Sequence, residues 1–453
     1  MEKIPAVEQY TPPHFARDGK IHVRLTEGFF QNLRRLTSWP LLALFFGLVW
    51  IQYDGQALLL FSFAERKLIL FGAFFSWYDL PLLTGLMIAG ACLLFFMAVA
   101  WGRIWCGFAC PQSIWTWLFI RIEDITEGRA GMRSRLEGKP MGRGLLLRRV
   151  TKHLLWMLFA IFTALTFTGY FIPIRELISA GVSLEMSGTV TGWLAIMAGL
   201  TYVNAGLVRE KICLHACPYS RFQAVMFDKD TRTVSYDVAR GEPRAKRHHA
   251  DKHSGDCVDC SLCVQVCPVG IDIRDGLQAA CIDCAACIDA CNNVMEKLDL
   301  PTGLIRFASE AQLEQKPSPL MRPRLAGYGT VMIAAFCAVL YGFYNTNDLQ
   351  VAIRRDRGPL FTQLGEHHIC NSYIIKVEGF NPAESIVRVS LYDEGQYELS
   401  GPAEINLAEN NAAWLSYRVC SQDVRSAIST LTFHFQGNQI FTAKETTFLA
   451  KPI

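Results

Sequence analysis

Two cysteine runs decide the fold of this chain: Cys257-x2-Cys260-x2-Cys263-x3-Cys267-Pro268 and Cys281-x2-Cys284-x2-Cys287-x3-Cys291. Two such runs in tandem have the ligand spacing of a bacterial ferredoxin with two [4Fe–4S] clusters. Three closely spaced thiolates wrap one cluster, and the fourth thiolate of each run binds the other cluster. The spacing therefore predicts one cluster on Cys257, Cys260, Cys263 and Cys291, and a second on Cys281, Cys284, Cys287 and Cys267.

Two other uses of these cysteines were weighed. A zinc site takes four ligands per ion and rarely needs this spacing twice in succession. Disulfides are the other alternative, but thiols that face the cytosol stay reduced. Iron–sulfur ligation is therefore the favoured interpretation for these eight of the sixteen cysteines.

The rest of the chain is apolar: 51% of its 453 residues are hydrophobic, and the mean hydropathy is +0.20. Apolar stretches predict five transmembrane helices, near residues 36–53, 80–101, 152–172, 190–208 and 326–344. Residues 56–78 are also apolar, but Glu65, Arg66 and Lys67 interrupt them. Three adjacent charges would be costly at the bilayer centre, so we expect a hairpin at the outer surface there. We expect no secretory signal, because the first apolar run begins near Trp39.

Basic residues are concentrated between the second and third predicted helices. This loop contains Arg103, Arg121, Arg129, Arg133, Arg135, Lys139, Arg143, Arg148 and Arg149. The opposite loops carry only Arg66, Lys67 and Arg175. Because loops rich in Lys and Arg stay in the cytoplasm, we expect the N-terminus and the cluster-binding region inside. Five helices then place the C-terminal region outside.

From about residue 350 the pattern changes to short alternating runs, such as 373–377, 386–389 and 430–435, bounded by Gly, Asn and Pro. Alternation with period two predicts strands, and their spacing predicts a small all-β sandwich of immunoglobulin type. The chain is thus expected to be a multi-domain membrane protein. Its predicted parts are a cytosolic tail (1–35), a transmembrane domain (36–225), a ferredoxin-like domain (226–325), a fifth transmembrane helix (326–344) and the sandwich (350–453).

A second cysteine pattern occurs twice, as Cys106-x3-Cys110-Pro111 and Cys213-x3-Cys217-Pro218. Each copy of this CxxxCP motif follows a pair of predicted helices, which indicates an internal repeat. Such repeats commonly meet at a pseudo-two-fold axis, so we expect the four sulfurs together. If each motif is helical, its two thiols lie on one face. Soft thiolates select Cu(I), zinc or iron–sulfur clusters, so we predict a redox or metal site rather than simple packing.

Other cysteines and histidines carry weaker signals. Cys92 and Cys337 lie within predicted helices, where packing as small side chains is the favoured interpretation. His215 lies inside the second CxxxCP motif and is a candidate ligand. His153 is as well explained by an interfacial position, and the group His248, His249 and His253 by a solvated surface.

The predicted outer domain has its own small cluster. His367, His368 and Cys370 have copper-ligand chemistry, and Cys420 is the other cysteine of this domain. A disulfide between Cys370 and Cys420 is allowed in this compartment, but only geometry can decide it. We find no Gly-rich phosphate loop, dinucleotide-binding motif or nucleophile triad, and no nucleic-acid partner is expected.

The order of these parts resembles the cytochrome c oxidase accessory proteins of the FixG/CcoG/RdxA family. The stretches that carry the resemblance are 105–112, 217–223, 240–244, the tandem cluster motifs and 303–306. The resemblance covers nearly the whole chain, including the sandwich. Ser261 and Ala285 depart from it, since this family often has Gly there, and the second run lacks the Pro after Cys291. Because the ligands are intact, we expect these changes to tune the cluster potential.

The resemblance implies a multi-pass protein of the bacterial inner membrane that takes part in assembly of cbb3-type oxidases. It implies reduction of Cu(II) to Cu(I), with Cys106, Cys110, Cys213 and Cys217 as the copper-related site. The cofactors would be two [4Fe–4S] clusters and copper. Expected partners are oxidase subunits or copper chaperones and a cytosolic or quinol electron donor, and a homodimer is left open.

Three functions are therefore compared. The first is a metalloreductase that supplies Cu(I). The second is a quinol-linked electron conduit, because related membrane ferredoxins share the CxxxCP layout. The third is an assembly scaffold whose sandwich docks on oxidase subunits.

Overall fold

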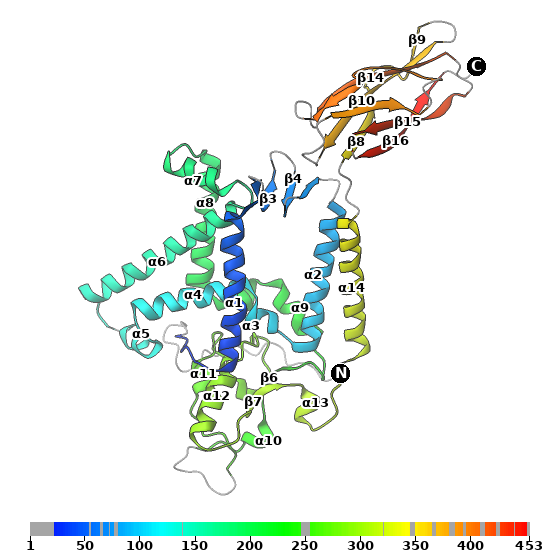
Figure 1. The fold of residues 1–453 in the computed structure, drawn as a ribbon. Coiled ribbons are helices and arrows are strands. Elements are labelled where there is room, and N and C mark those ends of the chain that lie inside the picture. Colours follow the sequence, from blue (N-terminus) through cyan, green and yellow to red (C-terminus); the bar gives the residue numbers. More distant parts are fainter. Residues whose placement is uncertain are drawn as a thin grey trace. The chain divides into compact units, whose positions relative to one another are not determined.

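The computed structural model describes residues 22–53, 56–63, 67–71, 73–76, 80–137, 139–245, 254–319, 321–344, 349–364, 368–379, 386–392, 396–407, 413–422, 426–438 and 440–450. Two compact units are present (Figure 1). The larger one comprises residues up to 71 together with 81–339, and the smaller one comprises 72–80 and 340–453. The larger unit contains both cysteine patterns.

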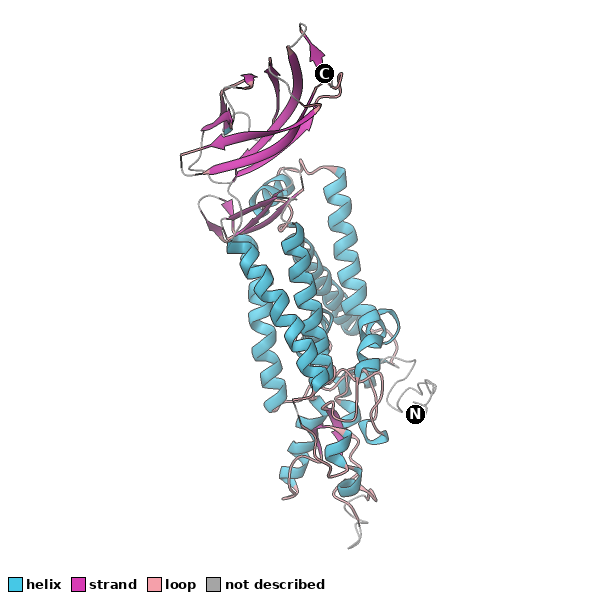
Figure 2. Cartoon of the chain, turned by 90° about the vertical axis from the view of Figure 1, so that its right-hand side faces the viewer, coloured by secondary structure: helices cyan, strands magenta, loops and turns pink. Residues whose placement is uncertain are grey.

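Four helices in the described ranges are long and apolar enough to cross a membrane. They are α2 (Leu80–Trp101), α6 (Arg143–Thr168), α8 (Gly188–Thr201) with its π-helical continuation Tyr202–Val208, and α14 (Pro323–Tyr344). Only 11% to 33% of each apolar window is buried inside the protein, which suits helices whose outer faces contact lipid. Figure 2 shows them as the long cyan helices.

The predicted span 36–53 is not among these four by length and composition, so a fifth crossing stays a prediction. Its residues belong mostly to α1 (Phe29–Gly47), which a 3₁₀ turn at Leu48–Trp50 follows. The helix begins in polar sequence that includes Arg34 and Arg35, which lowers the mean hydropathy of its N-terminal part. The span predicted at 152–172 begins earlier and ends earlier, because α6 is helical from Arg143 to Thr168.

Shorter helices follow the membrane helices, and some of them carry the CxxxCP motifs. They are α3 (Ile104–Phe108), α4 (Pro111–Thr126), α5 (Ala130–Glu137), α7 (Ile174–Val182), a π-helical segment at Ile212–Ala216, and α9 (Pro218–Met226). The described residues of the stretch 56–78 include an antiparallel pair, Leu59–Ser62 with Lys67–Leu70, which agrees with the predicted hairpin. The stretch contains β2 (Gln56–Ala57), β3 (Leu59–Ser62), β4 (Lys67–Leu70) and β5 (Ala73–Ser76), and β1 (Gln52–Tyr53) precedes it. Glu65 and Arg66 lie outside the described residues.

The ferredoxin-like region is built around one short antiparallel pair. Strand β6 (Thr233–Tyr236) pairs with β7 (Ile305–Ala308), and the cysteine runs lie between them in sequence. The helices of this region are α10 (Val238–Gly241), α11 (Leu262–Gln265), a 3₁₀ turn at Ile273–Asp275, α12 (Ala286–Lys297) and α13 (Glu310–Leu313). Its core includes cluster cysteines and the fully buried side chains of Ile288, Met295 and Leu304.

The C-terminal unit confirms the predicted β-sandwich. One sheet has the order β12-β14-β10-β8 with β9 beside β10, and the other has the order β13-β11-β15-β16. The strands are β8 (Leu349–Arg355), β9 (Thr362–Gln363), β10 (Ile369–Gly379), β11 (Ile386–Leu391), β12 (Glu398–Ser400), β13 (Glu404–Asn406), β14 (Trp414–Ser421), β15 (Ile428–Gln436) and β16 (Phe441–Leu449). Tyr373, Phe433 and Phe435 are fully buried between the sheets.

Candidate redox and metal centre

The structure brings the fourth cysteine of each run beside the other run. Cys291, on α12, interacts electrostatically with Cys257, Cys260 and Cys263. Cys267 interacts in the same way with three cysteines of the second run: Cys281, Cys284 and Cys287. This is the interleaved arrangement that the spacing predicts for two cubanes.

The second set of cysteines surrounds a hollow. A cavity of about 340 Å³ is lined by Cys267, Cys281, Cys284 and Cys287, with Cys263 also at its wall. Burial raises the pKa of the Cys263, Cys267 and Cys291 thiols to about 12. The thiols would stay protonated by themselves, so a positively charged iron centre is what makes their thiolates favourable here. Both the hollow and the donor set fit a [4Fe–4S] cluster.

The loops that hold these cysteines are tightly turned. Ser261 and Ala285, which precede α11 and α12, have φ angles of 55° and 57°. This left-handed region favours glycine, because a Cβ crowds the following carbonyl oxygen there. Ser261 and Ala285 therefore occupy a conformation that favours glycine, as do Asp259 and Asp283 of the same loops, with φ angles of 48° and 51°.

Both CxxxCP motifs have the same local architecture. The second cysteine of each, Cys110 or Cys217, is extended and caps the N-terminus of the next helix, whose first residue is the proline. Neither motif is one continuous helix, so the condition for placing both of its thiols on one helical face is not met. Proline disfavours a helical conformation in the residue before it, so the chain leaves α3 before Cys110 and the π-helix before Cys217.

The four CxxxCP sulfurs lie in one neighbourhood. The Cys106 thiol interacts electrostatically with the thiols of Cys110, Cys213 and Cys217. Burial is the main reason why the pKa of Cys106 rises to about 12 and that of Cys213 to about 11. The set is not closed around an ion, since no three of these sulfurs lie within 4.8 Å of one another in the described part of the chain.

Gln223 is a further buried residue beside these sulfurs, and no sequence pattern identified it as a site residue. The side chain of Gln223, on α9, is fully buried, and its Oε1 accepts a hydrogen bond from Cys106 Sγ at 3.3 Å. Its Nε2 has no hydrogen-bond partner. The atom that faces the sulfur is the amide oxygen, an acceptor, so this contact favours the protonated Cys106 thiol. The only signal in the sequence was its place in the stretch 217–223.

Arg103 connects both CxxxCP motifs to the second cluster loop. Its side chain is buried, and its guanidinium donates to the carbonyl oxygens of Ser220, Ala279 and Cys281. Its backbone N–H donates to Asp283 Oδ2 at 2.8 Å. Sequence reasoning counted Arg103 only as a basic loop residue, because long-range contacts leave no local pattern.

Direct packing makes the same connection. A Cβ added to Gly107 would lie 2.8 Å from the backbone of Ile282, Asp283 and Cys284. Cys106 packs against a buried apolar cluster that includes Ile282 and Cys284. The CxxxCP site and the second cluster site therefore share one packed wall.

Comparisons with known proteins decide the family. A model described as a 4Fe-4S dicluster domain matches residues 208–310, and one described as an IG-like fold at the C-terminal of FixG matches residues 339–451. The Nitrogen fixation protein FixG of Rhizobium meliloti is 31% identical over 422 residues, which cover 84% of this chain and 80% of that protein. The chain belongs to the FixG family. It is an iron–sulfur protein of the oxidoreductase type.

Other FixG-family proteins are similar over the same extent. Protein RdxA of Cereibacter sphaeroides is 33% identical over 398 residues, covering 84% of this chain and 83% of that protein. Protein RdxB of the same organism is 31% identical over 404 residues, covering 85% and 84%. A crystal structure of a FixG-related protein from Vibrio parahaemolyticus covers 23% of this chain at 19% identity, with a TM-score of 0.21, too low to support a conclusion.

A buried ion network anchors the second CxxxCP motif of this FixG-family protein. Glu123, on α4, forms ion pairs with Arg133 at 2.6 Å and with Arg209 at 2.7 Å, and Lys152 lies 3.9 Å away. Burial would raise the pKa of Glu123, but Arg209 and the other cations more than offset it, so its pKa is lowered. Arg209 directly precedes the segment that carries Cys213, so the network fixes where that motif starts.

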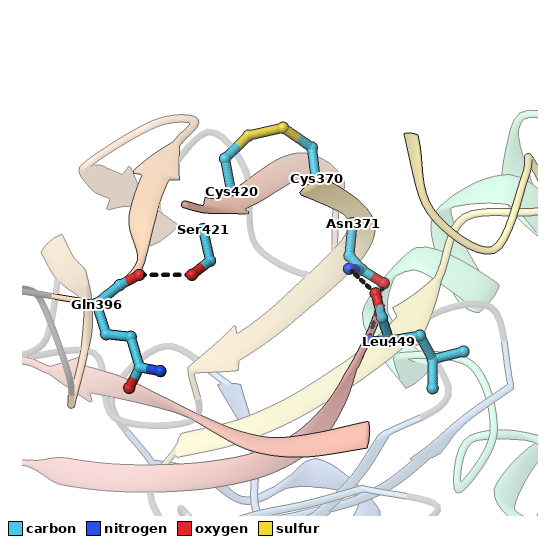
Figure 3. Close-up of a disulfide and its surroundings, with 6 residues drawn as sticks. All are labelled: Cys370, Asn371, Gln396, Cys420, Ser421 and Leu449. Carbon is cyan, nitrogen blue, oxygen red and sulfur yellow. Dashed lines mark hydrogen bonds between the residues drawn. A yellow bond between two sulfur atoms is a disulfide. The ribbon is translucent and has the colours of Figure 1, made fainter. Parts of the chain in front are cut away.

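The other histidines and cysteines that the sequence singled out lie in different environments. His153 Nδ1 and Tyr202 Oη are 2.8 Å apart, which fits the interfacial interpretation, and His215 is exposed. His248, His249, His253 and His367 lie outside the described residues. Cys370 and Cys420 form a disulfide (Figure 3). Cys92 is half-buried and Cys337 is exposed on its helix.

Proposed function

We propose that this FixG-family protein reduces Cu(II) to Cu(I) at Cys106, Cys110, Cys213 and Cys217, for assembly of cbb3-type cytochrome c oxidases. The observation that carries the proposal is the shared wall between Cys106 and the second cluster loop. A metal site that abuts a cluster site can receive electrons without movement of the domains. A site used for storage alone would not need this contact.

The chemistry of the four thiols suits the product of this reaction. Cu(II) prefers nitrogen and oxygen ligands, whereas thiolates favour Cu(I), so the site would stabilise the reduced ion. Copper binding would release the thiol protons, whose loss is costly in the metal-free site. Since no three sulfurs are within 4.8 Å, the ion would draw them together.

The clusters, when bound, supply one-electron carriers of low potential. The chain's own contribution is to hold their ligand loop against the CxxxCP site through Arg103 and Gly107. Arg103 also places a positive charge near Cys106 and Cys213, which opposes the effect of burial on both thiols. This residue would favour the thiolate forms that copper needs.

The proposed topology follows from charge and from α1. The basic loop after α2 argues for a cytoplasmic cluster region in a bacterial inner membrane. Within the larger unit, α1 begins at the cluster domain, where Asp289 accepts from Gln31 N at 2.7 Å. It ends beside Tyr170, which follows α6 and donates to Phe45 O. Helix α1 therefore reaches from the cluster domain to the segment that follows α6, and a crossing by α1 in addition to the four candidate spans would put the sandwich in the periplasm, near oxidase subunits or copper chaperones.

Anaerobic Cu(II) reduction by the purified full chain tests this function. The clusters are first reduced chemically, and formation of Cu(I) is followed with a Cu(I)-specific chelator. Replacing Cys106, Cys110, Cys213 and Cys217 by Ala should abolish reduction and leave the cluster spectrum unchanged. The matched control is Cys337→Ala, an exposed cysteine on α14. Reduction at the wild-type rate by the four-Ala variant would place copper chemistry elsewhere.

A second candidate function, a quinol-linked electron conduit, is favoured by one cavity. A hollow of about 640 Å³ lies between α1, α4 and the cluster loops, and Trp117, Ile120, Cys213 and Val269 are among its lining residues. An apolar hollow beside both redox sites could admit the ring of a quinol donor. Cluster reduction by a soluble quinol analogue, lost on Trp117→Ala, would support this role.

A further inference from the structure

The outer sandwich carries a group of soft ligands that the proposed function does not use. The donor atoms of His368, Cys370 and Cys420 all lie within 4.8 Å of one another. Among the described residues, no other group of three or more His, Cys, Asp or Glu side chains brings its donor atoms this close together. The Nε2 atom of His368 is buried and has no hydrogen-bond partner.

The two cysteines do not belong to the core of the sandwich. Along β10, Tyr373 and Ile375 face the core, so Cys370 is on the opposite face of the sheet. Figure 3 shows its neighbour Asn371 pointing away from the disulfide to bond with Leu449, and Ser421 pointing toward Gln396. The sulfurs are nevertheless almost fully covered, since Cys370 is 2% exposed and Cys420 is 7% exposed.

The disulfide is one of many links between its two strands. Strands β10 and β14 pair over eight successive residue pairs, from Ile369–Ser421 to Lys376–Trp414, and Cys370–Cys420 is one of them. The sandwich core lies on the other face. The disulfide therefore joins strands that a full ladder already pairs, and it lies beside an imidazole whose Nε2 has no hydrogen-bond partner, a combination that points to ligand chemistry in addition to cohesion.

We propose that Cys370, Cys420 and His368 form a Cu(I) site that opens when the disulfide is reduced. A dithiol reductant supplies two electrons and two protons through thiol–disulfide exchange, and its own thiols become a disulfide. The two thiols then lose their protons to bind the ion, and His368 supplies the third ligand through its unpartnered nitrogen. Two thiolates and one imidazole are a soft donor set that suits Cu(I). In the disulfide form the sulfurs are poor ligands. Exchange with a disulfide oxidant, which takes up two electrons and two protons and becomes a dithiol, would re-form the Cys370–Cys420 bond and release the ion.

This inference is independent of copper reduction at the CxxxCP motifs. Its test therefore uses the full chain with Cys106, Cys110, Cys213 and Cys217 replaced by Ala, so that copper bound there does not contribute. The protein is kept anaerobic. No more than one equivalent of Cu(I) is added, and a chelator buffers its free concentration. Binding is measured before and after treatment with dithiothreitol, followed by its removal. Thiol labelling and circular dichroism report reduction and folding.

The reduced protein should bind about one Cu(I) per chain, and the disulfide form should bind none. His368→Ala should weaken binding by at least about tenfold, since an imidazole ligand is lost. The matched control is His434→Ala, on β15 and packed against Tyr392 and Phe441. It should bind as the parent does.

Three results would overturn the proposal. They are a disulfide that cannot be reduced while the domain stays folded, equal Cu(I) binding by the reduced and disulfide forms, and an His368→Ala variant that binds as tightly as its parent. If the His368→Ala variant fails to fold, copper X-ray absorption of the reduced parent decides instead. A sulfur-only shell would then count against the proposed ligands, and mixed sulfur and nitrogen ligands would support them.

Discussion

Gly107→Ala is the substitution that most directly tests the wall between the CxxxCP site and the second cluster. The added Cβ would lie 2.8 Å from the Ile282 oxygen, the Asp283 oxygen and the Cys284 Cα. Distances under 3.0 Å are essentially never seen for a real Cβ, and all three neighbours are backbone atoms. No side chain can rotate to make room, so either α3 or the cluster loop at 282–284 must move.

The size of the effect follows from this geometry. Forcing one extra methyl group into a packed wall typically costs about 1–3 kcal/mol. Each kcal/mol lowers the unfolding midpoint by about 2–4 °C for a unit of this order of size. Because the displaced loop contains Cys281 and Cys284, we expect the second cluster to be lost at a lower temperature than in the parent.

The assay is an anaerobic thermal ramp of the purified chain, followed by the visible absorption of the clusters, with iron content measured beforehand. Gly131→Ala in α5 is the matched control, because a Cβ there meets nothing within 4 Å. Helical alanine is favoured over glycine by about 0.5–1 kcal/mol, so this control should be no less stable than the parent. Identical midpoints for Gly107→Ala and Gly131→Ala would refute the close contact between α3 and the cluster loop.

Four further predictions address other parts of the larger unit. Arg103→Lys should destabilise the protein by about 2–3 kcal/mol in denaturant unfolding, because a single ammonium nitrogen cannot occupy the positions of both guanidinium nitrogens that donate to these carbonyls, whereas Arg135→Lys at an exposed position of α5 should have little effect. Ser261→Gly should stabilise by about 1 kcal/mol by relieving a left-handed backbone, and an unchanged midpoint would argue against that strain. Cys267→Ala should lower iron content from about eight to about four per chain, with loss of the cluster on the second run; loss of the first cluster instead would contradict the interleaving. Glu123→Gln should destabilise by about 3–5 kcal/mol at pH 7. Since the folded pKa of Glu123 is lowered, its contribution is present above the unfolded pKa and lost as pH falls below it, so the difference from the parent should shrink toward pH 4; a difference independent of pH would exclude this carboxylate as its source.

The sequence predicted the parts of this protein that local spacing determines. The cluster ligands repeat at fixed intervals, and the sandwich strands alternate with period two, so both could be recognised without a structure. The breaks before Cys110 and Cys217 could also have been expected, because each precedes a proline. The structure excludes the alternative, a continuous helix through each CxxxCP motif.

Other features depend on contacts between distant parts of the chain. Arg103 meets Ser220 and Ala279 only after two membrane helices and the cluster loops have packed. Gln223 becomes notable only because its amide is buried without a partner for one of its atoms. The bounds of the first predicted span differ from those of α1 for another reason: hydropathy near residues 36–53 did not show that the helix would start in polar sequence at Phe29.

The exchange of Cys267 and Cys291 between the two runs has a consequence for how the protein matures. Neither iron centre can be completed by one run alone, because each needs one thiolate from the other. Building the first centre would fix Cys291 and α12, and with them much of the cavity wall for the second. We expect loading to be nearly all-or-none, so that iron scarcity lowers the number of mature molecules and leaves few that are half-filled.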